Sequence, residues 1–284
     1  DDFFHYVNGS WLESYELKPD QNRFGAFMKL RERSEERVKA IIQDLADAAP
    51  EDGTVEQKVA DYYNSYMDAE ARNERGIDAI APELERIAAI ESRSALVSVL
   101  GRTGLDGTIS PIDGGISFDR KDPDRYVLSL GQSGLGLPDR SDDLEDTERF
   151  TKCRDASESH IATLLGFTGM SEEAAASQAA DVLALEKAVA EHHWPREDLR
   201  DADKTYNVYT LESLQEDFPA FDWVTYFEAG KFDAQSLGEM NVRTPSAISP
   251  LAKLVEETPL ETFKAYLTYH VVSNHAQFLS EEID

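Results

Sequence analysis

Apolar residues recur every three or four positions over most of the chain, the spacing that places them on one face of an α-helix. The clearest example is AFMKLRERSEERVKAIIQDLADAA at residues 26–49. The segment PEDG at residues 50–53 ends this helix, and Thr54 with Gln57 forms a capping box that begins another. The second helix carries one apolar residue and three aromatic ones: Val59, Tyr62, Tyr63 and Tyr66.

The same periodicity returns in several later segments. Thr210 is a further helix start, and Thr258 followed by Pro259 and Glu261 is another, because Pro suits the first helical position and Glu completes a capping box. The pattern therefore predicts helices over residues 77–91, 94–104, 142–166, 171–192 and 259–279.

Between residues 107 and 140 the pattern changes to alternating and β-branched residues separated by Gly and Pro. GTISPIDGGISFD and DRYVLSLGQSGLGLPDR predict two strands followed by an ordered loop. Gly131, Gly134 and Gly136 lack the Lys of a phosphate-binding loop, so we expect them to serve turns or close backbone approach. The predicted fold class is mainly α, a multi-helical lobe with a small β element around residues 107–137.

The opening stretch DFFHYVNGSW, residues 2–11, is rich in aromatic residues and contains an Asn8-Gly9 pair that predicts a turn. Terminal residues usually fray unless something holds them, and exposed apolar patches mark interfaces. We therefore expect this cluster to fold back on the chain or to pack against a partner: Phe3, Phe4, Tyr6 and Trp11.

Charge narrows the classes of partner. The chain of 284 residues has 28 Lys and Arg against 56 Asp and Glu, a net charge of −28. Nucleic acid is excluded as a partner, because phosphate binding depends on clustered basic residues, and an anionic membrane surface is disfavoured for the same reason. The acidic run SDDLEDTE at residues 141–148 lacks the ligand spacing of a calcium loop and is interpreted as a helix start. No apolar stretch is long enough for a membrane span.

The histidines do not form a helical zinc motif. His270 and His275 are five positions apart, which separates them by roughly 140° around a helix. His192 and His193 are adjacent, and together with Trp194 they are interpreted as a helix C-terminus. The single cysteine, Cys153, excludes a disulfide framework within the chain. We expect no metal site and no catalytic residue in this chain.

Arg23 differs from the other charged residues because it lies in a loop, QNRFG, ahead of the first long helix. Its planar guanidinium could bind a carboxylate. The alternative is a surface Arg paired with a nearby acid.

Four ordered blocks of the chain resemble one known family. They are DDFFHYVNGSWLESYELKPDQNRFGAFMKLRERSEERVKAII, RYVLSLGQSGLGLPDR, HHWPREDLRDADKTYNVYTLESLQEDFPAFDW and TPLETFKAYLTYHVV. Together they are similar to the N-terminal half of the neprilysin and endothelin-converting-enzyme family of zinc endopeptidases, which includes bacterial PepO-type oligopeptidases.

The resemblance implies a non-catalytic helical lobe, residues 1–284, that encloses a chamber for short peptides. Residues 1–25 would pack against the catalytic lobe, and residues 26–284 would form the helical lobe. The HExxH motif and the zinc would lie in a C-terminal catalytic half, the expected partner, so this chain alone is expected to be inactive. Arg23 matches the family's Arg that binds a peptide's terminal carboxylate. The resemblance also implies an extracytoplasmic location, periplasmic or secreted, and the single Cys suggests a bacterial member.

The chain departs from the family pattern at two places. Met28 stands where some relatives have an acid, and Ser141, Asp142 and Asp143 replace the Asp-Tyr-Tyr that often follows LPDR. We expect the chain to be a separate subunit, a cleavage product or a fragment of a longer peptidase. A stand-alone helical module that binds peptides or proteins is the alternative. An independent enzyme would need paired carboxylates of shifted pKa, which a sequence does not show.

Overall fold

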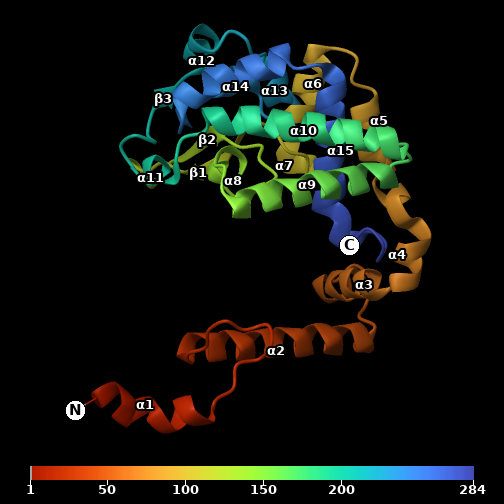
Figure 1. Ribbon diagram of the computed structural model, residues 1–284, viewed down its shortest axis with the longest axis vertical. Helices are drawn as coiled ribbons and strands as arrows, with labels where there is room; N and C mark the ends of the chain where they lie inside the picture. Colours follow the sequence, from red (N-terminus) through yellow and green to blue (C-terminus); the bar gives the residue numbers. More distant parts are fainter. Residues whose placement is uncertain (1) are drawn as a thin grey trace. The chain divides into compact units, whose positions relative to one another are not determined.

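The computed structural model describes residues 2–284. The chain divides into two compact units, Asp1–Ala69 and Glu70–Asp284. We call them the N-terminal unit and the main unit and describe each by itself. The N-terminal unit consists of helices α1 (Phe3–Ser14), α2 (Ala26–Ala48) and α3 (Val55–Met67) (Figure 1).

Helix α1 runs through the Asn8-Gly9 pair, so the turn predicted there is wrong. The carboxylate of Asp2 accepts a hydrogen bond from the His5 amide at 3.1 Å and caps the first turn. The Asn8 side chain donates to the Phe4 carbonyl at 3.1 Å. Because the cap and this side-chain bond are both made within the helix, the pair continues it rather than breaking it.

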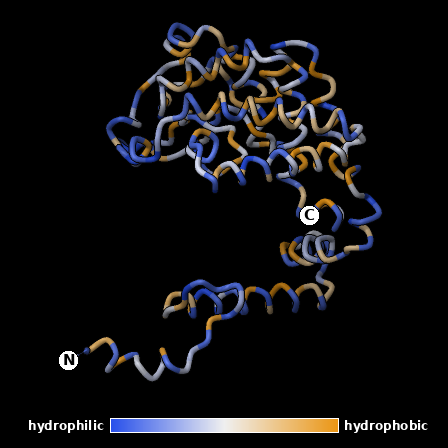
Figure 2. Tube along the Cα trace, viewed as in Figure 1, coloured by the Kyte–Doolittle hydropathy of each residue, from blue (hydrophilic) through white to orange (hydrophobic). Residues whose placement is uncertain are grey.

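The predictions for the next two helices are confirmed. Ala49, in the left-handed conformation, ends α2, and Thr54 caps α3 by accepting from the Gln57 amide at 3.2 Å. Helices α2 and α3 pack against each other, yet Ala60 is the only buried residue of α1, α2 and α3. Hydrophobic and hydrophilic residues are interspersed along all three helices (Figure 2). The N-terminal unit therefore has almost no core of its own.

The main unit contains the remaining helices and all the strands of the described residues. The elements are α4 (Ala69–Arg75), η1 (Gly76–Ile80), α5 (Ala81–Ala88), α6 (Arg93–Leu100), α7 (Thr103–Asp106), β1 (Ile112–Phe118), β2 (Tyr126–Gln132), α8 (Arg140–Leu144), α9 (Glu148–Phe167), α10 (Glu172–His192), α11 (Arg196–Leu199), β3 (Val208–Tyr209), α12 (Leu211–Asp217), α13 (Trp223–Ala229), η2 (Ala234–Ser236), β4 (Met240–Val242), α14 (Pro245–Glu257), α15 (Leu260–His275) and η3 (Ala276–Phe278).

Helix α15 lies at the centre of the main unit's core. Nine of its residues between Phe263 and Val272 are buried, so it is apolar on nearly all sides, as a fully enclosed helix must be. It packs against α5, α9 and α10, and α10 in turn packs against α14 (Figure 1). The core is continuous from these helices to the buried face of the sheet.

The sheet has the strand order β1-β2-β4-β3. The hairpin of β1 and β2 confirms the predicted β element, and β2 pairs parallel with β4, which pairs antiparallel with β3. The strands β3 and β4 are too short to show a periodic pattern, and the sequence analysis missed them. Successive side chains alternate between the two faces, and one face packs into the core through Ile112, Leu128, Leu130, Met240 and Val242.

Several predicted helices are divided in the structure. Residues 77–91 form η1 and then α5, since Pro82 begins a new helix. Residues 94–104 form α6 and α7. The closing helix runs from Leu260 to His275 rather than from 259 to 279, and its N-cap is Pro259 without a side-chain capping bond, so the capping box predicted for Thr258 and Glu261 is wrong: Thr258 instead ends α14 as its C-cap.

Residues 142–166 form α8 and α9 rather than one helix. The break is stabilised by Arg154, whose guanidinium donates to the carbonyls of Asp142 at 2.9 Å and Glu145 at 3.0 Å. Thr147 then caps α9 by accepting from the Phe150 amide. The acidic run therefore contains one helix start, that of α9 at Glu148, whereas α8 begins just before the run at Arg140, with Asp139 as its N-cap. Among residues 2–284, no helix combines the length and hydrophobicity that crossing a membrane requires.

Candidate functional site

The aromatic cluster predicted at the start of the chain divides into two groups. Trp11 stacks on Tyr15, with ring centroids 4.9 Å apart, and Tyr15 stacks on Phe24 at 4.3 Å, so these rings hold residues 15–24 beside α1. The other three side chains project from α1 and are largely exposed: Phe3 77 %, Phe4 60 % and Tyr6 85 %. Nothing in the N-terminal unit covers them.

Arg23 lies in the loop before α2, next to Phe24 and two residues ahead of the N-cap, Gly25. Its side chain is exposed, and within residues 2–284 it has no hydrogen bond and no carboxylate within ion-pair distance. Met28, half-buried in the first turn of α2, offers no charge to orient it. The guanidinium is therefore available to a ligand.

The outer face of the sheet in the main unit forms a cavity of about 590 Å³. The register aligns Gly115, Ser129 and Asn241 across three neighbouring strands, and Ser117 and Gly131 occupy positions on the same face. Two glycines therefore leave the floor of the cavity open between polar side chains. A Cβ atom at Gly115 would meet nothing within 4 Å.

Charged side chains surround this polar floor. Arg120 and Arg243 line the cavity together with one carboxylate, Asp113. Asp113 accepts from the Thr103 hydroxyl at 3.1 Å, and Arg120 donates to the Thr205 hydroxyl at 2.9 Å. Arg243 is half-buried, and its Nε has no hydrogen-bond partner. The cavity thus carries two guanidinium groups that form no ion pair with a carboxylate of residues 2–284.

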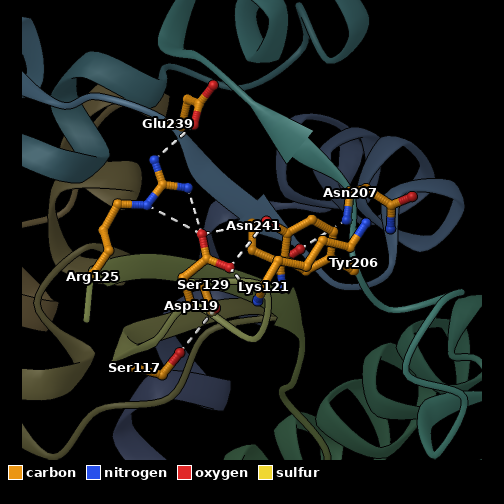
Figure 3. Close-up of polar contacts among 9 residues, drawn as sticks. All are labelled: Ser117, Asp119, Lys121, Arg125, Ser129, Tyr206, Asn207, Glu239 and Asn241. Atoms are coloured by element: carbon orange, nitrogen blue, oxygen red, sulfur yellow. Dashed lines mark hydrogen bonds and ion pairs between the residues drawn. The ribbon is translucent and has the colours of Figure 1, made fainter. Parts of the chain in front are cut away.

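A hydrogen-bond network centred on Asp119 supports one end of the cavity (Figure 3). Asp119, only 2 % exposed, follows β1 and accepts from the Arg125 guanidinium, the Lys121 amide at 2.9 Å and the Tyr206 hydroxyl at 3.0 Å. Arg125 also pairs with Glu239 at 2.8 Å. The network ties the turn of the hairpin to the segment before β3 and to the residue before β4.

The same contacts keep Asp119 ionised. Hydrogen bonds from the Arg125 side chain, the Lys121 amide and the Tyr206 hydroxyl lower the pKa of Asp119 to about 2. Asn241 adds a second link, since its side chain accepts from the Asn207 amide at 2.8 Å and donates to the Thr205 carbonyl at 3.1 Å. These groups are saturated by one another, so we assign them to positioning the cavity rather than to chemistry.

The glycine loop after β2 confirms the expectation of close approach. Gly134 has φ +97°, and a Cβ there would lie 2.8 Å from the Pro111 Cα. His193 follows α10, as predicted for a helix C-terminus, and its Nε2 lies 3.0 Å from the Ser133 carbonyl. Burial lowers the pKa of His193 to about 4, so the ring is neutral near pH 7.

Three ionisable side chains are enclosed between α8, α10 and α15. Glu186 on α10 is fully buried and lies 2.8 Å from His270 Nε2 on α15. Asp143 on α8 is 1 % exposed, and neither of its carboxylate oxygens has a hydrogen-bond partner. Burial, and then the negative charges of Glu186 and Asp142, raise the pKa of Asp143 to about 7.

The sequence analysis singled out neither Arg243 nor Asp119, and it noted Asp143 only as a departure from a family pattern. Arg243 follows a strand of three residues, and Asp119 is one acid among 56, so neither stands out in the sequence. The Gly114-Gly115 pair inside a predicted strand was the available signal, because a glycine there often marks close approach by a ligand or another backbone.

No three His, Cys, Asp or Glu side chains of residues 2–284 converge as metal ligands. His270 is engaged by Glu186, and His275 Nδ1 lies 2.8 Å from the Val271 carbonyl of its own helix. The residues present therefore do not fit a zinc ion.

Comparison with known proteins places these observations in a family. The profile of the N-terminal part of Peptidase family M13 matches residues 1–284. The chain belongs to this family. It is 24 % identical to endothelin-converting enzyme 1 of Cavia porcellus over 300 residues, which include 99 % of this chain but 38 % of the relative. The human enzyme gives 24 % identity, 99 % of this chain and 37 % of the relative.

Two solved structures extend the comparison. The zinc metalloprotease Zmp1 of Mycobacterium tuberculosis, in complex with an inhibitor, has a TM-score of 0.90 and 31 % identity over 100 % of this chain and 43 % of that one. PepO from Lactobacillus rhamnosis shares the fold, with a TM-score of 0.79 at 18 % identity over 100 % of this chain and 44 % of that one. The M13 chain therefore corresponds to the N-terminal portion of metallopeptidases and spans less than half the length of these relatives.

Proposed function

We propose that this M13 chain is the non-catalytic helical part of a zinc-dependent peptidase and that it works by closing over a C-terminal catalytic part. The observation that carries the proposal is the surface of the N-terminal unit. Phe3, Phe4 and Tyr6 project from α1, and helix α2 has no buried residue. So much uncovered apolar surface on three helices marks an interface.

Covering that surface would supply the energy of assembly. Burial of a large apolar side chain contributes about 1.5–3 kcal/mol. The three projecting rings of α1 would then contribute several kcal/mol to assembly. Residues 1–25 are the proposed contact with the catalytic part, and residues 26–284 form the proposed helical lobe.

The proposed activity of the whole protein is hydrolysis of peptide bonds in short peptides, outside the cytoplasm. The zinc would be held by the catalytic part, where it would supply Lewis-acid activation of water. This chain's own contribution is to enclose the substrate and to bind it. Arg23, exposed and free of any carboxylate in the described chain, is the proposed ligand of a peptide's terminal carboxylate.

Assembly with the catalytic part tests the proposal. The chain and the C-terminal part of the same peptidase are purified separately, and zinc content and hydrolysis of a quenched peptide are measured for each alone and for the mixture. We expect activity in the mixture and none with the chain alone.

Two variants make the test specific. Replacing Phe3, Phe4 and Tyr6 together by Ser should weaken assembly, whereas Val208→Ser, an exposed apolar residue of the main unit that is 48 % accessible, should not. Trp11 is left in place because it stacks on Tyr15 within the unit. Equal assembly by the triple variant and the natural chain would overturn the proposed interface.

A stand-alone peptide-binding module is the second candidate. The cavity on the sheet favours it, because Arg243 there is half-buried and lacks a counter-charge. Tight peptide binding by the chain, with no effect on any catalytic part, would support this candidate.

A further inference from the structure

The outer face of the sheet differs from an ordinary solvated face in having a floor of glycines. Gly115 and Gly131 lie on neighbouring strands of that face, and Arg243 follows β4 with its Cβ 3.6 Å from the position of a Gly131 Cβ. A glycine inside a strand weakens the strand and often marks a position that a ligand or another backbone approaches closely.

The edge of the same sheet is open to a further strand. In the β1 and β2 ladder the Ser133 amide donates to the Pro111 carbonyl and the Asp119 amide donates to the Arg125 carbonyl. Because bonded pairs alternate along an antiparallel ladder, the backbone groups of Gly114, Ile116 and Phe118 point away from β2. The Tyr226 hydroxyl already donates to the outward carbonyl of Ile112, which fits this alternation.

Natural sheets normally protect such an edge with Lys, Pro or a covering segment. Residues Gly114 to Phe118 carry neither Lys nor Pro, and all five are exposed. Ile116 is 63 % and Phe118 62 % exposed. A peptide in an extended conformation has the complementary pattern of amides and carbonyls.

The positive charge of the cavity favours peptides that carry a carboxylate. The cavity beside this edge contains Arg120 and Arg243 against one carboxylate, Asp113, in a chain whose net charge is −28. Arg243 is half-buried, its Nε has no partner, and no carboxylate of the described chain lies within ion-pair distance. A buried donor without a partner costs free energy that an incoming carboxylate would recover.

We infer that this cavity binds an extended peptide that pairs with the free edge of β1 and places a carboxylate on Arg243. The carboxylate comes either from an Asp or Glu side chain or from the peptide's C-terminus. The inference rests on the proposed function only in taking a peptide as the ligand. Arg23 belongs to the N-terminal unit and is not among the residues that line this cavity.

Fluorescence anisotropy on the 284-residue chain tests the inference without zinc or catalysis. The probes are three labelled octapeptides of alternating Thr and Val. The first has a central Glu and an amidated C-terminus, the second has Gln in place of that Glu and is also amidated, and the third has the Gln but a free C-terminal carboxylate. We expect a carboxylate-bearing peptide to bind at least about tenfold more tightly than the amidated Gln peptide, with less advantage at high salt. Which of the two binds identifies the source of the carboxylate.

Two variants locate the binding. Arg243→Gln should abolish the preference for the carboxylate, and Gly115→Val should weaken all three peptides, since a side chain there fills the floor of the cavity without touching the fold. Arg200→Gln and Gly238→Val are matched controls, because both residues are exposed and lie outside the cavity. Circular dichroism of each variant verifies folding.

Hydrogen exchange supplies a second readout. Bound peptide should slow exchange of the amides of Gly114, Ile116 and Phe118. Equal binding of all three peptides would overturn the carboxylate site. So would an Arg243→Gln variant that still prefers the peptide with a carboxylate. Binding without protection of those three amides would overturn the edge pairing. Because no catalytic part is present, neither result depends on whether the chain assembles into a peptidase.

Discussion

Asp143 should make the stability of the main unit depend on pH. Its carboxyl group is 1 % exposed, both oxygens lack partners, and the negative charge of Glu186 acts on it. The groups that face it from the neighbouring elements are Glu186 on α10, Asp142 on α8, Arg154 on α9 and Asp139 before α8. Arg154 favours the ionised form, but burial and the acids outweigh it. Asp143→Asn removes the charge and keeps the size of the protonated acid.

The size of this effect on the free energy of unfolding follows from the shift in the pKa of Asp143. The pKa of Asp143 is raised from 3.8 to about 7, so the folded chain holds a proton that the unfolded chain has released. A raised carboxyl pKa contributes stability at low pH that is lost as pH rises from about 4 to about 7. Each pKa unit corresponds to about 1.4 kcal/mol, which gives a loss of up to roughly 4 kcal/mol across that range. Above pH 7 the contribution is constant.

Urea unfolding at a series of pH values measures this loss. Trp11→Phe serves as the background, so that the fluorescence of Trp194 and Trp223 reports on the main unit. Asp143→Asn should be more stable than this background at pH 8 and close to it at pH 4.5. Asp142→Asn, one position earlier and half-buried, should follow the background at every pH.

Subtracting the free energies of unfolding of the two chains at each pH removes the contribution of the other titrating groups, which both chains share. A difference between Asp143→Asn and the background that stays the same from pH 4.5 to pH 8 would refute the reasoning. It would mean that Asp143 is ionised in the folded protein over this whole pH range, and that its carboxylate oxygens accept hydrogen bonds from a donor.

Two further predictions concern the loop after β2 and the proposed carboxylate ligand. Gly134→Ala should lower the free energy of unfolding by roughly 2–4 kcal/mol, because the backbone there is left-handed and the added Cβ would overlap Pro111. Gly166→Ala is the control and should not destabilise the chain, since its Cβ would meet nothing within 4 Å. Thermal unfolding measures both variants. In the assembled peptidase, Arg23→Gln should reduce kcat/KM for free-acid peptides by about tenfold or more and leave amidated peptides unchanged, with Arg37→Gln as the control. Equal losses for both peptide classes would remove Arg23 from carboxylate binding.

Capping residues and hydrophobic periodicity were sufficient to predict a helix or hairpin where residues close in sequence specify it. The capping residues Thr54 and Thr210 begin helices in the structure, and the alternation in residues 107–137 forms β1 and β2. These elements depend on caps and periodicity, which act over a few residues. The same local rules failed at Asn8-Gly9, where a cap at Asp2 and a side-chain bond to Phe4 outweigh the turn preference.

The candidate site could not be predicted in this way, because its parts are distant in sequence. Gly115, Arg120 and Arg243 meet only when β4 pairs with β2 across more than a hundred residues. The strand that precedes Arg243, β4, is too short for periodicity, and its position comes from burial of Met240 and Val242 against the core. Burial likewise decides the state of Asp143, since desolvation changes an ordinary acid into one that titrates near pH 7.

The sequence by itself determined the mainly α fold, the aromatic composition of the first residues, the lack of a zinc-binding motif and the family, because each of these depends on composition, on short spacings or on ordered blocks of residues. The tertiary structure alone decided which charges are isolated and which are neutralised. Arg243 and Arg125 are equivalent in a list of residues, yet one lies beside an open cavity without a counter-charge and the other is held by Asp119 and Glu239. The physical reason is that electrostatic interaction depends on distance and burial in the folded chain, and neither can be deduced from separation along the sequence.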